Sequence, residues 1–394
     1  MPSEWVETTI GGQVLLQRGY DITVKEQRPG TVPVISSGGV SSFHDTSSAK
    51  GPGVVLGRKG VVGSVYFVNQ DYWPHDTTLF VRDFKGNHPR FVFYFFKSFA
   101  PTLARLDVGS ANPTLNRNHV HPAPVRWPPL DEQRRIAAVL GALDDKIELN
   151  RKMNRTLEEM AQAIFKSWFI DFDGHDPADM VDSALRPIPK GWKVRPVGDV
   201  VKVVGGSTPS TKEPGYWAGG TFAWATPKDL SGVDVPVLLD TERRVTRSGL
   251  DSIGSGLLPI GTFLLSSRAP IGYIAIAQVP VAINQGFIAI PPGPLPPTYL
   301  LFWTRFNLDA IKARAGGTTF AEISKAGFRP IPMVVPPATV LDEFSAAVEP
   351  LFGRIVANTR QSRTLANLRD ALLPKLISGE LRVPEAEAIV GAAT

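Results

Sequence analysis

The sequence of 394 residues contains no cysteine. This absence excludes disulfide bonds, thiolate catalysis and zinc sites with cysteine ligands. Long hydrophobic runs are also missing, so no segment resembles a membrane span, and Met1 to Trp5 lack the basic and apolar regions of a signal peptide. We therefore expect a cytoplasmic protein.

The motifs of common enzyme classes are absent too. There is no phosphate-binding Gly-x-x-x-x-Gly-Lys-Ser/Thr loop, no nucleophile-and-base pattern of a hydrolase, and no carboxylate-and-lysine cluster of a metal-dependent nuclease. A base-amino methyltransferase needs an Asn/Asp-Pro-Pro-aromatic site, and the nearest match, Asn112-Pro113-Thr114, fails. His119 and His121 have no third ligand nearby, so we expect a surface strand and no metal site there. These absences favour a non-catalytic binding protein.

The net charge of +5 is unevenly placed along the chain. Residues 1–128 carry 13 basic and 9 acidic side chains, and residues 174–337 carry 16 and 12. Residues 129–173 carry 7 basic and 9 acidic side chains, and residues 338–394 carry 6 and 7. Two basic segments joined by slightly acidic connectors favour binding of a polyanion by the basic segments.

The chain repeats itself at a shift of 208 residues. Four prolines between Pro122 and Pro129 fall on four between Pro330 and Pro337, and Ile147 and Asn150 recur as Ile355 and Asn358. The offset drifts toward the start of each half, where Trp5 resembles Trp192 at a shift of 187. We therefore predict a duplication in which the connectors are more alike than the basic domains.

A long helix is predicted in each half. Between Asp131 and Trp168 the only proline or glycine is Gly141, and apolar residues recur at heptad spacing. The same spacing recurs 208 residues later, although we expect Pro350 to kink or interrupt the second helix. The helices are expected to pair as an antiparallel coiled coil, with pseudo-twofold symmetry from the duplication. The residues assigned to this pairing are Ile136, Leu140, Leu143, Ile147, Asn150, Leu157, Leu351, Ile355, Asn358, Leu365 and Leu372.

Asn150 and Asn358 occupy the same heptad position in the two helices. A buried asparagine at such a position fixes register and the number of partners. The alternative is that each asparagine faces water on a surface helix, since asparagine is rarely fully buried.

The two basic segments are predicted to be α+β domains with a curved sheet. Short apolar strands such as Gly53–Leu56 and Ile271–Ala277 are broken by glycine, proline and serine, and one aromatic-rich helix follows near Phe91–Phe99 and near Thr298–Phe306. The loops carry side chains that pair with base edges or bind phosphates. The candidate DNA-binding residues are Ser37, His44, Arg58, Lys59, His75 and Thr77 in the first domain, and Lys212, Tyr216, Trp217, Lys228, Arg268 and Gln285 in the second. A basic residue in a turn is often only solvated, so the prediction depends on the candidate residues taken together and not on any single one.

Five segments carry a family resemblance. They are residues 128–137, which read Pro-Pro-Leu-Asp-Glu-Gln-Arg-Arg-Ile-Ala, residues 143–150, which read Leu-Asp-Asp-Lys-Ile-Glu-Leu-Asn, residues 168–173, residues 188–192 and residues 373–381. They resemble the conserved regions of the specificity subunits of type I restriction-modification systems. Residues 337–344 depart from the pattern because they lack the Gln-Arg-Arg of the first copy, so the two docking surfaces are expected to differ in strength.

The resemblance implies a non-catalytic DNA-recognition subunit that acts in phage defence. Each target-recognition domain would bind one half of a split site in double-stranded DNA. The helices would dock two methyltransferase subunits, and a restriction and translocase subunit would complete the larger assembly. No cofactor is expected on this chain, and S-adenosylmethionine would be bound by the methyltransferase subunit. The implied boundaries are 1–128 for the first domain, 129–173 for the first helical region, 174–337 for a linker and the second domain, 338–383 for the second helical region, and 384–394 for a flexible tail.

A protein–protein scaffold that organises partners without reading sequence is the alternative function. DNA binding that weakens steeply with salt and does not discriminate among sequences would favour the scaffold.

Overall fold

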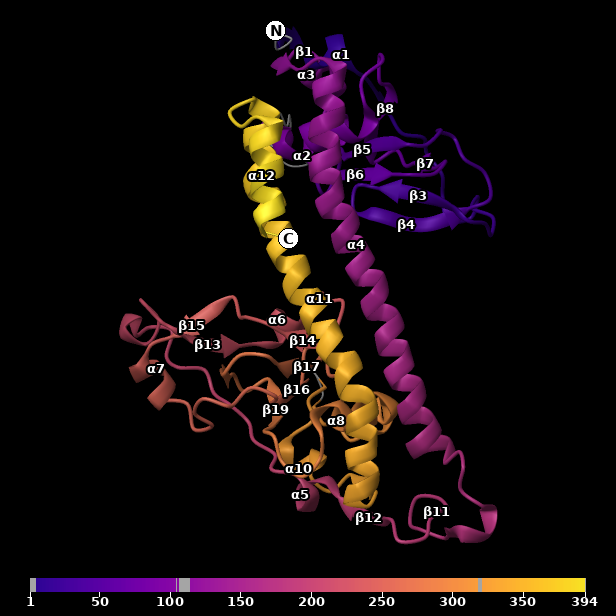
Figure 1. The fold of residues 1–394 in the computed structure, drawn as a ribbon, viewed down its shortest axis with the longest axis vertical. Coiled ribbons are helices and arrows are strands. Elements are labelled where there is room, and N and C mark those ends of the chain that lie inside the picture. The colour runs from indigo at the N-terminus through magenta and orange to yellow at the C-terminus, as the bar shows by residue number, and fades with distance from the viewer. Residues whose placement is uncertain (1–4, 104, 106–113, 318–320, 394) are drawn as a thin grey trace. The chain divides into compact units, whose positions relative to one another are not determined.

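The computed structural model describes residues 5–103, 105, 114–317 and 321–393, so Asn112 and Pro113 lie outside the described residues. It divides into two compact units, residues 1–147 with 363–394 and residues 148–362. Each unit holds one α+β domain and part of both long helices, α4 (Leu130–Lys166) and α11 (Ala338–Ser378) (Figure 1). Among the described residues, no helix is both long enough and apolar enough to cross a membrane.

The domain of the first unit is built on two small sheets and one strand pair. The first sheet has the order β2 (Leu15–Arg18), β8 (Thr78–Asp83), β5 (Gly53–Gly57), β6 (Val65–Val68), with antiparallel neighbours. The second has the order β4 (Gly39–His44), β3 (Val32–Ser36), β7 (Trp73–Pro74), and β1 (Val6–Thr9) pairs with β9 (Pro124–Trp127). Its helices are α1 (Ile10–Gln13), α2 (Pro89–Leu103) and α3 (Arg117–Val120).

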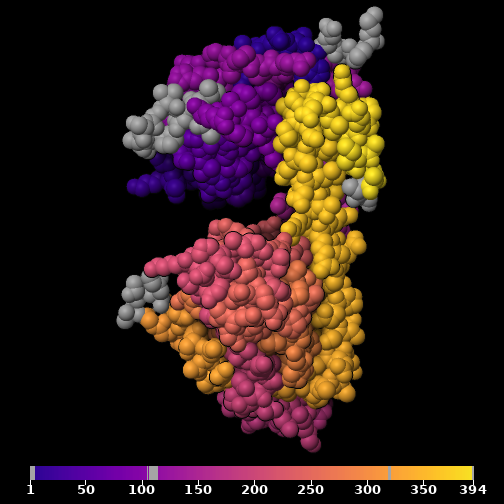
Figure 2. Space-filling view, turned by 90° about the vertical axis from the view of Figure 1, so that its left-hand side faces the viewer, coloured from indigo at the N-terminus to yellow at the C-terminus, as the bar shows by residue number. Residues whose placement is uncertain are grey.

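Helix α2 connects this domain to the long helices. Its residues Phe91, Phe95 and Phe96 are buried in one cluster with Leu16 and Leu56 of the sheet. The same cluster contains the start of α4 and the end of α11, represented by Ile136, Leu140, Leu143, Ile147, Leu365 and Leu372. Figure 2 shows the C-terminal residues of α11 packed against the surface of the first domain. In the first unit, the side chains at the heptad positions of α4 and α11 are therefore buried against the domain as well as against the other long helix.

The domain of the second unit has two sheets with mixed topology. One has the order β15 (Arg243–Val245), β13 (Phe222–Ala225), β18 (Val281–Ile283), and the other has β14 (Val237–Leu238), β17 (Ile274–Ala277), β16 (Phe263–Ser266), β19 (Phe287–Ile290). Strand β12 (Lys193–Pro196) pairs with β20 (Pro332–Val335), and β10 (Met180–Val181) with β11 (Ile188–Pro189). Its helices are α5 (Val197–Val200), α6 (Pro227–Leu230), α7 (Arg247–Asp251), α8 (Pro297–Phe306), α9 (Leu308–Lys312) and α10 (Lys325–Phe328).

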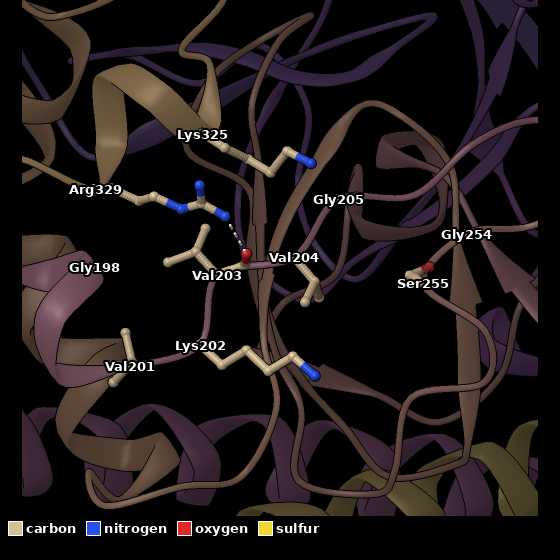
Figure 3. Close-up of a pocket in the computed structure, with 10 residues that line it drawn as sticks. All are labelled: Gly198, Val201, Lys202, Val203, Val204, Gly205, Gly254, Ser255, Lys325 and Arg329. Atoms are coloured by element: carbon tan, nitrogen blue, oxygen red, sulfur yellow. Dashed lines mark hydrogen bonds between the residues drawn. The ribbon is translucent and has the colours of Figure 1, made fainter.

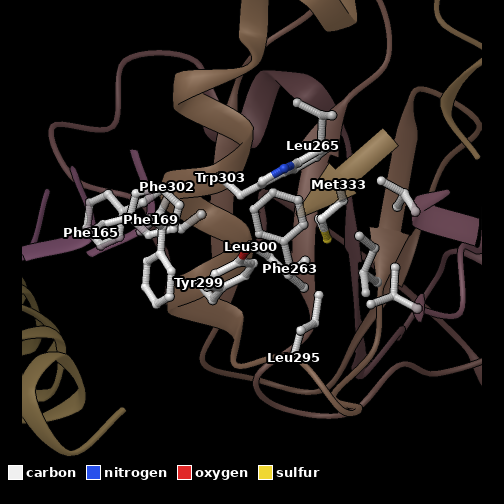
Figure 4. Packing of buried hydrophobic residues seen from close by; sticks show 14 of the residues in the cluster. Phe165, Phe169, Phe263, Leu265, Leu295, Tyr299, Leu300, Phe302, Trp303 and Met333 are labelled. Atoms are coloured by element: carbon white, nitrogen blue, oxygen red, sulfur yellow. The ribbon is translucent and has the colours of Figure 1, made fainter. Parts of the chain in front are cut away.

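Helix α8 has the same role in the second unit that α2 has in the first. Its Tyr299 packs against Phe165 at the end of α4 and against Phe169 in the π-helical turn Ser167–Asp171 that follows, and all three contact Phe344 at the start of α11. The close-up in Figure 4 shows Phe165, Phe169 and Tyr299 in one cluster with Phe263 and Met333 of the strands. The α+β class and both aromatic-rich helices are thus confirmed.

Equivalent hydrogen bonds occur in both units, with a shift of 187 residues between the donors and of 208 residues between the acceptors, the two shifts found in the sequence. The Ile10 N–H donates to the Ala123 carbonyl, and the Val197 N–H donates to the Ile331 carbonyl.

The contact between α2 and α4 in the first unit differs in chemistry from the contact between α8 and α11 in the second. Arg90 donates to the Gly141 carbonyl in the first unit, whereas Thr298 donates to the Glu349 carboxylate at the corresponding position in the second.

Within the second unit, α4 and α11 run antiparallel. Phe165 lies against Phe344, while Asn150, earlier in α4, donates to Ser362, later in α11. The expected interruption at Pro350 is wrong, because α11 is continuous from Ala338 to Ser378. The proline removes one backbone donor. The helical turns before and after it are stabilised by buried side chains, namely Phe344, Val348, Phe352 and Ile355.

Two further local predictions differ from the structure. Residues 384–394 were predicted as a flexible tail, yet Val383–Ala393 form helix α12, since Val383 and Ala386 bury in the cluster of the first unit. The surface strand expected at His119 and His121 is instead the short helix α3 and the residue that follows it, with Asn116 as its N-cap.

Candidate nucleic-acid interface

Five of the six candidate residues in the first domain meet around Thr77. The Ser37 N–H donates to Thr77 Oγ1 at 3.3 Å, and the N–H groups of Arg58 and Lys59 donate to the Thr77 carbonyl at 2.9 and 3.1 Å. His75 Nδ1 lies 3.1 Å from Thr77 Oγ1. Three loops that are separate in the sequence therefore form one polar surface, which we call the Thr77 surface.

An arginine and an aspartate extend the Thr77 surface. Arg18 pairs with Asp76 at 2.7 Å, and Arg58 lies 3.5 Å from the Asp76 carbonyl. Partial burial lowers the pKa of Arg58, with Arg18 adding to the effect, although the guanidinium stays charged at neutral pH. Sequence reasoning missed Arg18, since no motif marks it and only the pairing of β2 with β8 brings it here.

His44 does not belong to this surface. Its side chain is buried, its Nδ1 accepts the Arg28 N–H at 3.0 Å, and its ring packs edge-on against Trp73. A buried, partnered imidazole has no free edge for a base, so the structure contradicts the prediction of His44 as a DNA contact.

Asp21, His75 and Asp76 place three possible metal-ligating atoms within 4.8 Å of one another. Asp76 already pairs with Arg18, and Asp21 is exposed. Exposed acidic groups are common without an ion, so this arrangement by itself does not indicate a metal site.

Three candidate residues of the second domain lie on loops that meet at Gly286. The Ser267 N–H donates to the Gly286 carbonyl at 2.8 Å, and a Cβ built on Gly286 would lie 2.9 Å from Cγ of Pro227. The loops of Arg268, Lys228 and Gln285 are therefore neighbours.

These three side chains have replaceable partners. Lys228 pairs with Glu242 at 2.8 Å, Arg268 is 3.5 Å from Glu322, and Gln285 interacts with Thr208 at 2.6 Å. Exposed ion pairs contribute about 1 kcal/mol or less, so a phosphate or a base edge can compete with them.

Trp217 is not a free stacking platform. The Arg243 guanidinium lies 3.6 Å from the centroid of its ring, Trp224 packs edge-on at 5.0 Å, and the indole N–H donates to the Ser210 carbonyl. Tyr216 is half-buried next to it, and Lys212 is exposed on the same segment. Arg243 was missed by the sequence reasoning, although the Arg243-Arg244 pair was a visible signal.

The two central asparagines are buried between the helices of the second unit. Asn150 and Asn358 are 0% and 2% exposed. Asn150 donates to Ser362 at 3.1 Å, and Asn358 donates to Asn154 at 2.9 Å. The predicted burial is confirmed and the water-facing alternative is wrong, while a role in fixing register stays a prediction.

Solved structures with the same fold include the S subunit of a type I restriction-modification system from M. genitalium. The TM-score is 0.62, with 16% sequence identity over 95% of this chain and 96% of that chain. At this identity the likeness concerns the fold alone.

Sequence relatives and a family model extend the comparison. The MjaIX specificity subunit of a type I restriction enzyme from Methanocaldococcus jannaschii is 29% identical over 75% of this chain and 69% of its own length. The HindI specificity subunit from Haemophilus influenzae is 24% identical over 68% and 71%. The model of the type I restriction modification DNA specificity domain matches residues 2–159 and 189–343.

The chain therefore belongs to the type I restriction-modification DNA specificity family. This confirms the family predicted from residues 128–150, and with it the expectation of a DNA-recognition subunit rather than a catalytic one.

Proposed function

We propose that this specificity subunit recognises a bipartite site in double-stranded DNA, with one domain for each half-site. The observation that carries the proposal is the convergence of loops in each domain. Ser37, Arg58 and His75 meet at the Thr77 surface, and Lys228, Arg268 and Gln285 lie on loops that meet at Gly286. Arginine, lysine and glutamine are side chains that read base edges and hold phosphates.

We propose that α4 and α11 form an antiparallel coiled coil with approximate twofold symmetry. The 208-residue shift maps Asn150 onto Asn358 and Asn154 onto Ser362. The hydrogen bond from Asn150 to Ser362 and the one from Asn358 to Asn154 therefore join equivalent positions, with donor and acceptor helices exchanged. Such a polar layer suits a pairing that must keep one register.

The exposed faces of these helices would dock two methyltransferase subunits, and a restriction and translocase subunit would join the larger assembly. S-adenosylmethionine would be supplied by the methyltransferase subunits, since this chain carries no motif for it. The weaker match of residues 337–344 to the family pattern supports a difference in strength between the two docking surfaces.

The first prediction concerns methylation. The purified chain alone is expected to leave plasmid DNA unmethylated, and co-expression with the methyltransferase subunit of its own system is expected to produce methylation at one split sequence. Single-molecule sequencing of a host with and without both genes measures this. Site-specific methylation by the isolated chain would contradict the proposal, and so would unselective methylation with the partner present.

The second prediction concerns the half-sites. Arg58→Gln is expected to relax recognition in one half of the split sequence and Arg268→Gln in the other, each by about 1–3 kcal/mol of discrimination, the usual magnitude of one base contact. Methylome sequencing with each variant in the co-expressed complex gives the readout. The matched control is Arg247→Gln, an exposed arginine on α7 that pairs with Asp251. Relaxation of both halves by a single variant would count against one domain per half-site.

A further inference from the structure

A basic pocket lies in the second unit beside the predicted recognition loops. Its volume is about 710 Å³, and its lining includes Lys202, Lys325 and Arg329 but no acidic side chain. Figure 3 shows the three cationic side chains arranged around Val203, with Ser255 across the pocket. The lining therefore offers positive charge from two segments that lie far apart in the sequence.

Among the residues that the structure describes, the two lysines have no anionic partner. No ion pair of Lys202 or Lys325 occurs in the described part of the chain, and both side chains are exposed. The hydroxyl of Ser255 is buried and, among the described residues, has no hydrogen-bond partner. A pocket with two unpaired ammonium groups and an unused hydroxyl suits an anion that accepts several hydrogen bonds.

The pocket is held in shape by its arginine and glycines. Arg329 donates to the Val203 carbonyl at 3.1 Å, and a Cβ on Gly198 would lie 2.7 Å from Cβ of Arg329. A Cβ on Gly205 would lie 3.3 Å from Nζ of Lys325, so this lysine lies close over the Gly205 backbone. Arg329 thus has a structural role, and the lysines remain available for a ligand.

The first domain carries basic side chains at the equivalent positions. The 208-residue shift places Arg117 at the position of Lys325 and His121 at that of Arg329. Arg117 lies 3.5 Å from the Leu16 carbonyl, and His121 Nε2 accepts the Leu16 N–H at 3.0 Å. Burial lowers the pKa of His121, with Arg117 and Lys85 adding to the effect. A basic residue at this place is therefore a feature of both domains.

The pocket adjoins the proposed recognition loops. Two residues before Lys325, the Ile323 N–H donates to the carbonyl of Ser267, the neighbour of Arg268. Three residues beyond Gly205, Thr208 bonds Gln285. A DNA strand held at Arg268 and Gln285 would continue toward the lysines.

We propose that this pocket binds a backbone phosphate of the DNA, with Lys202 and Lys325 as the contacting residues and Arg329 as the residue that holds the pocket in shape. The inference rests on the proposed DNA-binding function. Contacts of this kind position the duplex and carry no sequence information, so the effect of the lysines is the same for every sequence.

The test is a fluorescence anisotropy titration of the full chain with a labelled DNA duplex of mixed sequence, repeated over a series of salt concentrations. The double variant Lys202→Gln/Lys325→Gln is expected to bind about tenfold more weakly at moderate salt, and its plot of log affinity against log salt to be shallower by about one unit. The variant Lys325→Arg keeps the charge and is expected to bind as the wild type does. Both lysines are exposed, and equal thermal unfolding midpoints check that the variants fold.

The matched control is Lys190→Gln/Lys193→Gln, which removes two exposed lysines of the same unit outside the pocket. Equal loss of affinity in both double variants overturns the inference, because net charge alone then explains the effect. Calorimetric titration with inorganic phosphate forms the second arm. Tight binding of phosphate that disappears in Lys202→Gln/Lys325→Gln, together with unchanged DNA binding, overturns the inference in favour of a site for free phosphate. A wild-type chain without affinity for any duplex overturns the proposed function itself.

Discussion

Replacing Phe344 by alanine is expected to lower the free energy of unfolding of the second unit by about 3–5 kcal/mol, the usual loss for a buried phenylalanine. Phe344 is 0% exposed. Its ring contacts Phe165, Trp168, Phe169 and Tyr299, with centroids 5.1 to 6.3 Å apart. The cavity left by the ring would therefore remove contacts that join α11 to the end of α4, to the π-helical turn Ser167–Asp171 and to α8.

Urea unfolding of the full chain, read by hydrogen exchange of peptides within residues 148–362, measures this loss. Met160→Ala is the matched control, because Met160 is an apolar side chain of α4 in the same unit that is 48% exposed. We expect it to change stability by about 0.5 kcal/mol or less. A Phe344→Ala chain as stable as the Met160→Ala chain would show that the aromatic cluster does not hold this unit together.

The second large effect is expected at Asp144, in the first unit. Tyr94 donates its hydroxyl to the Asp144 carboxylate at 2.7 Å, and Arg369 of α11 pairs with the same carboxylate. Burial, followed by the hydrogen bond to Asp144, raises the pKa of the Tyr94 hydroxyl above its usual value, so the group stays a donor. Asp144→Ala would leave the buried Tyr94 hydroxyl without an acceptor and remove the ion pair with Arg369. We expect the free energy of unfolding to fall by about 3 kcal/mol in total.

Asp145→Ala is the control for this experiment. Asp145 is the next residue of α4 and also pairs with an arginine, Arg90, but its side chain is 66% exposed. We expect a loss of about 1 kcal/mol or less, because solvent screens the pair. Urea unfolding measures the loss in free energy of unfolding for both variants. A third variant, Asp144→Asn, keeps an acceptor for the Tyr94 hydroxyl and is measured beside them. Equal destabilisation by Asp144→Ala and Asp145→Ala would refute the assignment of Asp144 as a half-buried link between α2, α4 and α11.

The long helices were predictable because their signal is local and repeated. Heptad spacing depends only on neighbouring residues, and it correctly indicated α4 and the buried position of Asn150. The prediction at Pro350 failed because helix propensity is a local quantity, while α11 is held by buried side chains on both sides of the proline. The helical state of residues 383–393 likewise depends on the burial of Val383 and Ala386, which composition does not reveal.

The candidate interface was predictable only in outline. Loop residues such as Arg58 and Thr77 could be chosen by type, but their meeting at one surface depends on strand pairing across the sheets. His44 was chosen for its chemistry, and only the packing against Trp73 reveals that it is buried. Lys202 and Lys325 were missed because the pocket joins two segments that are distant in the sequence. The 208-residue shift, which aligns Lys325 with Arg117, was the available signal.

The contact between each domain and its long helix limits how freely the parts of this protein can be exchanged. The Arg90 guanidinium donates to the Gly141 carbonyl and lies so close that a Cβ at 141 would displace it, whereas Thr298 donates to the carboxylate of Glu349. A domain moved from one position to the other would lose its own contact with the helix: Thr298 would find no carboxylate at Gly141, and Arg90 would meet the Glu349 carboxylate in place of the Gly141 carbonyl. The unit that can be exchanged is therefore the domain together with the first turns of the helix that follows it. A domain exchanged at its own boundary alone would lack its native contact with that helix.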